Sequence, residues 1–137
     1  NRASEIFAEE AEDIRASWLY RSTQDTNRII VGLFNGVGTI YKDRNVRGGW
    51  INEGKLDGVE EGIRTIMEDK NGDVWLGTEQ DGVIRLRFSS VPGSPSISNP
   101  EFKYYGVNHG LPAGGTAVFK VDNEIYYTMK DGVFRYI

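Results

Sequence analysis

Two apolar runs flank a polar turn in the stretch that decides the fold, Ile63-Arg64-Thr65-Ile66-Met67-Glu68-Asp69-Lys70-Asn71-Gly72-Asp73-Val74-Trp75-Leu76-Gly77-Thr78. A second turn, Glu79-Gln80-Asp81-Gly82, leads into a third apolar run at residues 83–88. Short runs rich in Val, Ile and aromatic residues, separated by turns that contain Gly and Asn, are typical of antiparallel strands. This stretch therefore predicts consecutive β-hairpins.

The hairpin pattern occurs again on both sides of this stretch. Upstream, residues 28–33 lead through Phe34-Asn35-Gly36 into residues 37–41, and downstream, residues 124–129 lead through Lys130-Asp131-Gly132 into residues 133–136. The three turn glycines recur at intervals close to the ~40–50 residues of a four-stranded propeller blade. The alternating pattern of the runs excludes a helical solenoid, the other kind of repeat protein.

Further β runs complete each repeat. One precedes each hairpin, at residues 14–20, 63–68 and 116–121, and a fourth follows the first two hairpins, around residues 49–52 and 102–105. Small antiparallel sheets must stack on one another to bury their faces. We therefore expect an all-β fold, a fragment of a β-propeller with about three four-stranded antiparallel blades, of which the last is incomplete.

The expected boundaries follow from these runs. Blade 1 covers residues 12–57, blade 2 covers 58–106 with a long loop at 89–101, and blade 3 covers 107–137. Residues 1–11 form an N-terminal segment whose Ala and Glu content favours a helix. Because the chain begins with Asn1 and ends inside an expected strand, we expect the natural protein to continue at both ends.

Composition narrows the functional classes. The chain has 20 Asp and Glu against 16 Lys and Arg, so it offers no cationic field for nucleic acid or for anionic lipid. It has no cysteine and a single histidine, His109, which together exclude the usual zinc sites and cysteine nucleophiles. We expect no nucleic acid partner, no direct membrane contact, no cofactor and no catalytic residue in this segment.

One motif has the spacing of calcium ligands. Asp69, Asn71 and Asp73 alternate as the first oxygen ligands of a calcium loop do. Trp75 and Leu76 then return at once to a strand, where a calcium loop would continue to a bidentate acid. The segment is therefore interpreted as a tight hairpin turn, and no metal site is expected.

Apolar residues on the expected strands have a structural interpretation. Side chains on strands alternate between the two faces of a sheet, and both faces of a blade meet a neighbour. The residues expected to pack between blades are Ile29, Val31, Trp75, Ile84, Leu86 and Tyr126.

At this point the motifs resemble a known family. The stretch at residues 63–78, with Gly82-Val83-Ile84-Arg85-Leu86 after it, is similar to the repeat of two-component regulator propellers, in which an acidic residue and a turn glycine precede tryptophan and Gly-Thr. The third copy resembles it through Gly110-Leu111-Pro112, Thr128 and Gly132-Val133, with Tyr126 in place of tryptophan. The first copy departs further, with Ile30 at the tryptophan position and Leu33 at the threonine position.

The resemblance implies a function. It implies a bacterial sensor, in which such a propeller is the periplasmic ligand-binding region of a hybrid histidine kinase or a related membrane-bound signalling protein. The propeller is then a non-catalytic head tuned to a small molecule or an oligosaccharide, and the kinase lies outside this chain.

A candidate binding face follows from strand direction. Because strands alternate, the turns between second and third strands share one end with the connections between blades. That end groups Phe34-Asn35 and Lys55-Leu56-Asp57 with polar residues near the expected channel. Tyr105 adds a surface on which a sugar can stack. The candidate ligand-binding residues are Glu79, Gln80, Asp81, Tyr105, Asn108 and His109.

Other functional classes stay open. The chain can belong to an enzyme propeller, a lyase or glycosidase acting on polysaccharide, if blades outside it supply the acids. It can also be a pure protein-interaction propeller, which an exposed apolar patch would indicate. An incomplete ring leaves sheet faces uncovered, so self-association through the exposed blade faces is expected.

Overall fold

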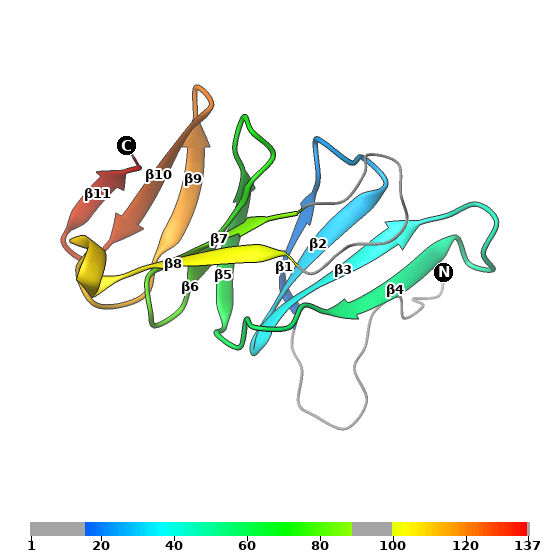
Figure 1. Cartoon of the computed structure of the whole chain (residues 1–137), viewed down its shortest axis with the longest axis horizontal. Coiled ribbons are helices and arrows are strands. Elements are labelled where there is room, and N and C mark those ends of the chain that lie inside the picture. The colour runs from blue at the N-terminus through cyan, green and yellow to red at the C-terminus, as the bar shows by residue number, and fades with distance from the viewer. Residues whose placement is uncertain (1–15, 89–99, 137) are drawn as a thin grey trace, which may run out of the picture.

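Three antiparallel β-sheets lie side by side in the computed structural model, which describes residues 16–88 and 100–136 (Figure 1). Each sheet is called a blade below. Blade 1 contains β1 (Ala16–Arg21), β2 (Arg28–Leu33), β3 (Gly36–Lys42) and β4 (Trp50–Lys55). Blade 2 contains β5 (Ile63–Glu68), β6 (Val74–Thr78), β7 (Val83–Arg87) and β8 (Glu101–Tyr105). Blade 3 contains β9 (Ala117–Val121), β10 (Glu124–Met129) and β11 (Gly132–Arg135), and the short 3-10 helix η1 (Val107–His109) precedes it.

This arrangement confirms the predicted fold class, an all-β propeller fragment with an incomplete last blade. Within each blade, strands that follow one another in the sequence are hydrogen-bonded neighbours in the sheet. Two predicted features fall outside the described residues: the N-terminal segment at 1–11 and most of the loop at 89–101. The fourth run of blade 1, expected around residues 49–52, is a longer strand that ends at Lys55.

The hairpins form because their turn residues tolerate the backbone angles that tight turns need. Asp122 and Asn123 connect β9 to β10 with φ angles of 51° and 65°. Positive φ at both central positions matches the twist of the flanking strands, and Asn and Asp adopt it more readily than other residues with a Cβ. In blade 2, Gly82 has a φ of 73° just before β7. The turn chemistry therefore fixes the strand register.

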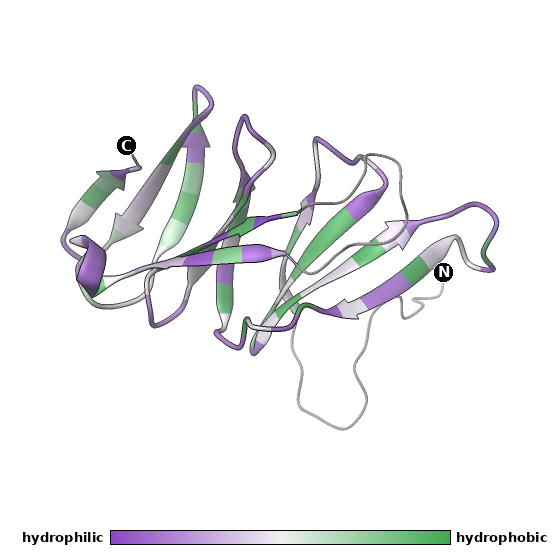
Figure 2. Cartoon of the chain, in the orientation of Figure 1, coloured by the Kyte–Doolittle hydropathy of each residue, from purple (hydrophilic) through white to green (hydrophobic). Residues whose placement is uncertain are grey.

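An aliphatic core joins blade 1 to blade 2. Alternate residues of β6 and β7, among them Leu76 and Leu86, face blade 1 and are fully buried. Hydrophobic bands cross the strands in alternation with polar ones (Figure 2). The buried members of this core are Ile30, Val37, Val59, Ile63, Ile66, Val74, Leu76, Ile84 and Leu86. Ile84 and Leu86 thus lie between two blades, as the sequence predicts.

An aromatic core joins blade 2 to blade 3. Trp75, which is 1% exposed, packs with Val118, Ile125 and Tyr127 of blade 3. The blades approach closely beside Gly77, where a Cβ would lie 2.3 Å from the backbone oxygen of Thr116. Glycine in the Trp-Leu-Gly-Thr motif therefore provides the space that blade 3 occupies.

Three residues predicted to lie between blades have other surroundings in the described part of the chain. Ile29 and Val31 alternate with Ile30 and lie on the face of blade 1 that points away from blade 2, where they pack within their own sheet. Tyr126 lies on the corresponding outer face of blade 3, because its neighbour Tyr127 faces blade 2. The alternation is as expected, but within residues 16–88 and 100–136 no further blade covers these faces.

Candidate functional site

The turns and connections predicted to share one end of the blades do lie together. The backbone N–H of Glu79 donates to the carbonyl of Gly62 at 2.9 Å, which joins the β6–β7 turn to the connection between blades 1 and 2. The backbone N–H of Gly82 donates to the carbonyl of Gly114 at 3.1 Å, which joins the same turn to the connection between blades 2 and 3. We call this end of the molecule the connection end.

A hollow of about 130 Å³ opens at the connection end. Three predicted ligand-binding residues, Asp81, Asn108 and His109, lie in its wall, and all three are exposed. Apolar atoms of Val107 and Pro112 lie beside them. A carboxylate, an amide and an imidazole supply donors and acceptors, so the wall can form hydrogen bonds with a ligand that has several polar groups.

The short helix η1 sets the position of two of these side chains. Asn108 and His109 lie in this single turn, which ends at Gly110 with a left-handed φ of 85°. The backbone N–H of Gly106 donates to Nδ1 of His109 at 3.4 Å. In a neutral imidazole an accepting Nδ1 leaves the proton on Nε2. His109 therefore presents a donor on its other ring nitrogen.

Tyr104 also lines the hollow, and the sequence reasoning missed it. Its hydroxyl donates to the backbone oxygen of Asp81. Burial raises the pKa of Tyr104 above its usual value, and the negative charges of Asp81 and Glu61 raise it further. The hydroxyl therefore stays protonated near neutral pH and remains a hydrogen-bond donor.

Tyr105, predicted as the sugar-stacking residue, is half-buried between blades 2 and 3. Its ring stacks on that of Trp75 with the centroids 5.7 Å apart, and the ring of His109 meets its edge at 5.5 Å. Register explains the difference from Tyr104, because Tyr105 pairs with Val83, which faces blade 3, and Tyr104 pairs with Ile84, which faces blade 1. The pairing of β8 with β7 is therefore what distinguishes the positions of these two adjacent tyrosines.

The two other predicted residues, Glu79 and Gln80, lie on the β6–β7 turn beside Asp81. Both are exposed, and neither is part of the wall of the hollow. Their part in ligand binding stays a prediction.

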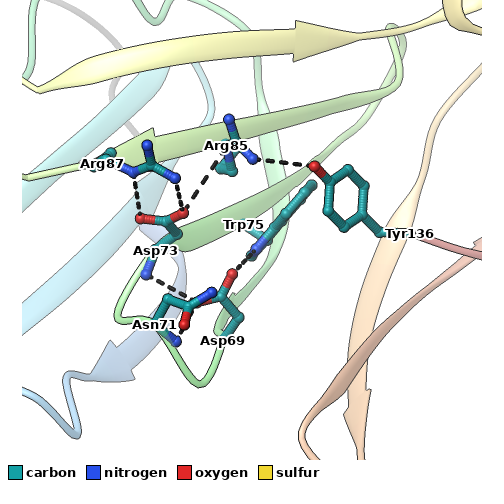
Figure 3. Close-up of polar contacts among 7 residues, drawn as sticks. All are labelled: Asp69, Asn71, Asp73, Trp75, Arg85, Arg87 and Tyr136. Carbon is teal, nitrogen blue, oxygen red and sulfur yellow. Dashed lines mark hydrogen bonds and ion pairs between the residues drawn. The ribbon is translucent and has the colours of Figure 1, made fainter.

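The polar turn of the family-like motif has a structural role (Figure 3). Oδ1 of Asp69 accepts the backbone N–H groups of Asn71 and Asp73 at 2.8 and 3.0 Å, and Oδ2 accepts the indole N–H of Trp75 at 2.9 Å. Asp73, which is buried, accepts two hydrogen bonds from the guanidinium of Arg87 at 3.0 and 2.8 Å. The carboxylates with calcium-like spacing thus hold the hairpin and its tryptophan in place.

The described residues offer no metal site and no membrane span. Within residues 16–88 and 100–136, no group of three or more His, Cys, Asp or Glu side chains is arranged to hold a metal ion. The same residues include no helix with the length and apolar character needed to cross a membrane.

Comparison with known proteins bears on the motif of blade 2. Residues 58–80 match the family model described as two component regulator propeller. They run from the connection after blade 1 through β5 and β6 into the turn at the connection end. Neither the curated proteins nor the solved structures gave a match. The matched family is thus the one that the sequence motifs of blade 2 resemble, the two component regulator propellers, and the match covers residues 58–80 of the 137.

Proposed function

We propose that this chain is a non-catalytic, ligand-binding segment of a two-component sensor, and that its ligand is a carbohydrate. The observation that supports this proposal is the hollow at the connection end. There Asp81, Asn108 and His109 converge beside Tyr104 and Pro112. Sugar hydroxyls both donate and accept hydrogen bonds, and the C–H face of a sugar ring packs on apolar surface. The volume of about 130 Å³ limits the contact to one sugar unit, and the rest of an oligosaccharide would lie outside the hollow.

The position of the hollow suggests how binding is transmitted. Asp81 belongs to a turn of blade 2, whereas Asn108 and His109 belong to the connection that leads into blade 3. A ligand that contacts both favours the arrangement in which turn and connection are held together. Blade 3 then carries the signal toward an output domain outside this chain. The periplasmic location that the family resemblance implies is part of the proposal.

The test is a thermal-shift and calorimetric screen of the chain against oligosaccharides of different classes. A ligand that binds only the folded state raises the melting temperature. We expect one sugar class to bind saturably, and Asn108→Ala and Asp81→Asn to weaken that binding. Gln24→Ala, at the opposite end of the blades, is the matched control and should leave it unchanged.

Two results would contradict the proposal. If no sugar class binds, the carbohydrate assignment fails. If a sugar binds and chromatography shows that it has been cleaved, the segment is catalytic, and the lyase or glycosidase alternative replaces a sensor.

A second proposal concerns self-association, which the outer face of blade 3 supports. Phe119, Val121 and Val133 lie on this face and are 43%, 53% and 69% exposed. Glu124 and Arg135 lie on the same face, so a second copy related by a twofold axis can pair them across the contact.

Sedimentation tests this second proposal. We expect a dimer whose population rises with concentration, and we expect Phe119→Lys to dissociate it, because a buried unpaired charge is costly. Lys130→Ala, in the exposed turn between β10 and β11, is the control. A wild-type chain that stays monomeric at every concentration contradicts self-association.

A further inference from the structure

A second polar pocket lies at the opposite end of the blades from the hollow, between blades 1 and 2. Its volume is about 180 Å³. It is bounded by the β1–β2 and β5–β6 turns and by parts of the strands that they join. The residues in its wall are Ser22, Gln24, Asp25, Arg28, Ile30, Glu68, Asn71, Gly72, Val74 and Phe88.

The carboxylate of Glu68 is the least exposed charged group of this pocket, at 2%. It extends from blade 2 to blade 1, where Oε2 accepts the hydroxyl of Ser22 at 2.8 Å and Oε1 accepts the backbone N–H of Thr23 at 2.7 Å and the hydroxyl of Thr23. These donors are all uncharged. In the part of the chain that the structure describes, no cationic side chain forms an ion pair with Glu68.

Arg28, the cation among the described residues of the wall, is engaged with other carboxylates. It is 5% exposed, and its guanidinium pairs with Asp25 and, at 3.0 and 3.2 Å, with both oxygens of Glu53, which lies outside the wall. Among the described residues, the wall therefore carries two carboxylates, those of Asp25 and Glu68, and one guanidinium. The negative charge of Glu68 also contributes, after burial, to a raised pKa of Tyr20.

The equivalent pocket between blades 2 and 3 provides an internal comparison. It lies beside the β5–β6 and β9–β10 turns and has a volume of about 340 Å³. One acid in its wall, Asp69, is balanced by one base, Lys70. Glu124 and Arg135 also border this pocket, but strand alternation places their side chains on the outer face of blade 3. An excess of negative charge is therefore a property of the blade 1–blade 2 pocket and not of every interblade pocket at this end.

We propose that the pocket between blades 1 and 2 binds a primary ammonium group carried on a short apolar stem. An ammonium supplies three N–H donors and a positive charge, and it would be a cationic partner for the Glu68 carboxylate. The side-chain carbonyls of Gln24 and Asn71 are further acceptors in the wall, and Ile30, Val74 and Phe88 provide apolar surface for the stem.

Pocket size limits the ligand. A volume of about 180 Å³ is smaller than the ~300–1,000 Å³ typical of pockets for drug-sized molecules. The ligand is therefore a small alkylamine or the end of a lysine-like side chain. This site is separate from the hollow at the connection end and does not depend on the proposed carbohydrate function.

The test compares two molecules that differ mainly in charge. n-Butylammonium and its neutral isostere n-butanol are titrated into the chain, and two-dimensional amide NMR follows the side-chain signals of Gln24 and Asn71. We expect saturable shifts of both signals with n-butylammonium and none with n-butanol. Equal responses to the two molecules, or no saturable shift with n-butylammonium at high millimolar concentration, overturn the proposal.

Substitutions locate the charge that matters. Glu68→Gln keeps the shape of the side chain, and we expect it to weaken n-butylammonium binding at least about tenfold, because a charge-assisted hydrogen bond becomes a neutral one. Glu60→Gln, an exposed carboxylate in the connection between blades 1 and 2 and outside the pocket wall, is the matched control and should leave the affinity unchanged. Unchanged affinity in Glu68→Gln overturns the proposal. If that variant does not fold, Asp25→Asn takes its place with the same expectation.

Discussion

The two faces of blade 2 differ in the kinds of side chain that contact the neighbouring blades. Toward blade 1 the contact is aliphatic, and Glu68 adds hydrogen bonds that cross from one blade to the other. Toward blade 3 the contact is aromatic, and the ring of Trp75 lies 5.7 Å from that of Tyr105, 6.0 Å from Tyr127 and 4.8 Å from Tyr136.

The aromatic face contains polar groups of a different kind, a guanidinium and phenol hydroxyls that lie among the rings. The guanidinium of Arg85 lies 5.7 Å from the Trp75 ring and donates to the hydroxyl of Tyr136 at 3.3 Å (Figure 3). The buried hydroxyl of Tyr127 has no hydrogen-bond partner among the described residues. Aliphatic contacts tolerate small shifts, whereas ring pairs and polar groups require a particular geometry. The blade 2–blade 3 contact is therefore the more geometry-dependent of the two.

The largest expected effect comes from removing the central ring of the aromatic face. Trp75→Ala should lower the free energy of unfolding by about 3–5 kcal/mol, because it leaves a large cavity in a closely packed core. Denaturant titration measures the loss. Hydrogen exchange should show faster amide exchange in blade 3 than in blade 1, because only blade 3 packs on Trp75.

Leu86→Ala on the aliphatic face is the matched comparison for Trp75→Ala. It should cost about 2–5 kcal/mol and accelerate exchange in blade 1 in preference to blade 3. If both variants loosen all three blades equally, the two contacts are not separate units and the comparison fails.

Adding a side chain at Gly77, where blades 2 and 3 approach closely, should have the next largest effect on stability. A Cβ at residue 77 would meet the backbone of Thr116 and lie 2.7 Å from the Thr65 hydroxyl oxygen, which accepts the backbone N–H of Val118. Gly77→Ala should therefore destabilise the chain by about 1–3 kcal/mol through overpacking. Gly48→Ala is unsuitable as a control because φ is 82° there, whereas Thr26→Ala, in the exposed turn between β1 and β2, tests a small change away from the interblade contacts. Wild-type stability in Gly77→Ala would show that the blades can separate at little cost.

Removing the interblade hydrogen bonds of the aliphatic face should have the third largest effect on stability. Glu68→Ala leaves the Ser22 hydroxyl and the Thr23 N–H without their acceptor. A buried donor that loses its partner costs about 1–3 kcal/mol. Thermal unfolding should show that loss, with Glu68→Gln intermediate because it retains one acceptor oxygen. Equal stability of all three chains would mean that these bonds contribute nothing.

The smallest effect should have the opposite sign. Tyr127→Phe removes a buried hydroxyl that has no partner in the described residues, so it should leave stability unchanged or raise it by up to about 1 kcal/mol. Tyr126→Phe, on the outer face of the same strand, is the control. A clear loss of stability in Tyr127→Phe would reveal a hydrogen bond from this hydroxyl.

The same residue predicts a pH dependence. Burial raises the pKa of Tyr127 above its ordinary value of 10.0. Above that pH the unfolded chain releases the proton while the folded chain retains it, so the stability falls as the pH rises. The fall has a slope of at most about 1.4 kcal/mol per pH unit for one group. It should be shallower in Tyr127→Phe, which melting curves at a series of alkaline pH values can measure.

Much of the fold could be predicted from sequence because its signals are local. Glycine-containing turns such as Asp81-Gly82 mark the hairpins, and the spacing of those turns gives the period of the blades. The sequence could not show which face of blade 1 packs on blade 2. Alternation places Ile29 and Val31 on one face and Ile30 on the other, but it does not say which of the two faces meets a neighbouring blade.

The candidate site was less predictable because it depends on register and on distant contacts. The turn carrying Asp81 and the helix carrying Asn108 and His109 could be placed at one end from strand direction alone. The choice between Tyr104 and Tyr105 required the pairing of β8 with β7. The burial of Glu68 required a partner, Ser22, that lies 46 positions earlier in the sequence.

The opposed directions of Trp75 and Leu76 on β6 have a consequence for how such chains lengthen. If blade 2 were duplicated in tandem, the indole of the first copy would meet the aliphatic side of the second, where the chain has instead the rings of blade 3. A newly copied repeat would therefore pack poorly against this indole until the residues on its facing side had changed. Each contact between neighbouring repeats therefore depends on their order. Exchanging that order should destabilise the protein even though all three described repeats are antiparallel sheets.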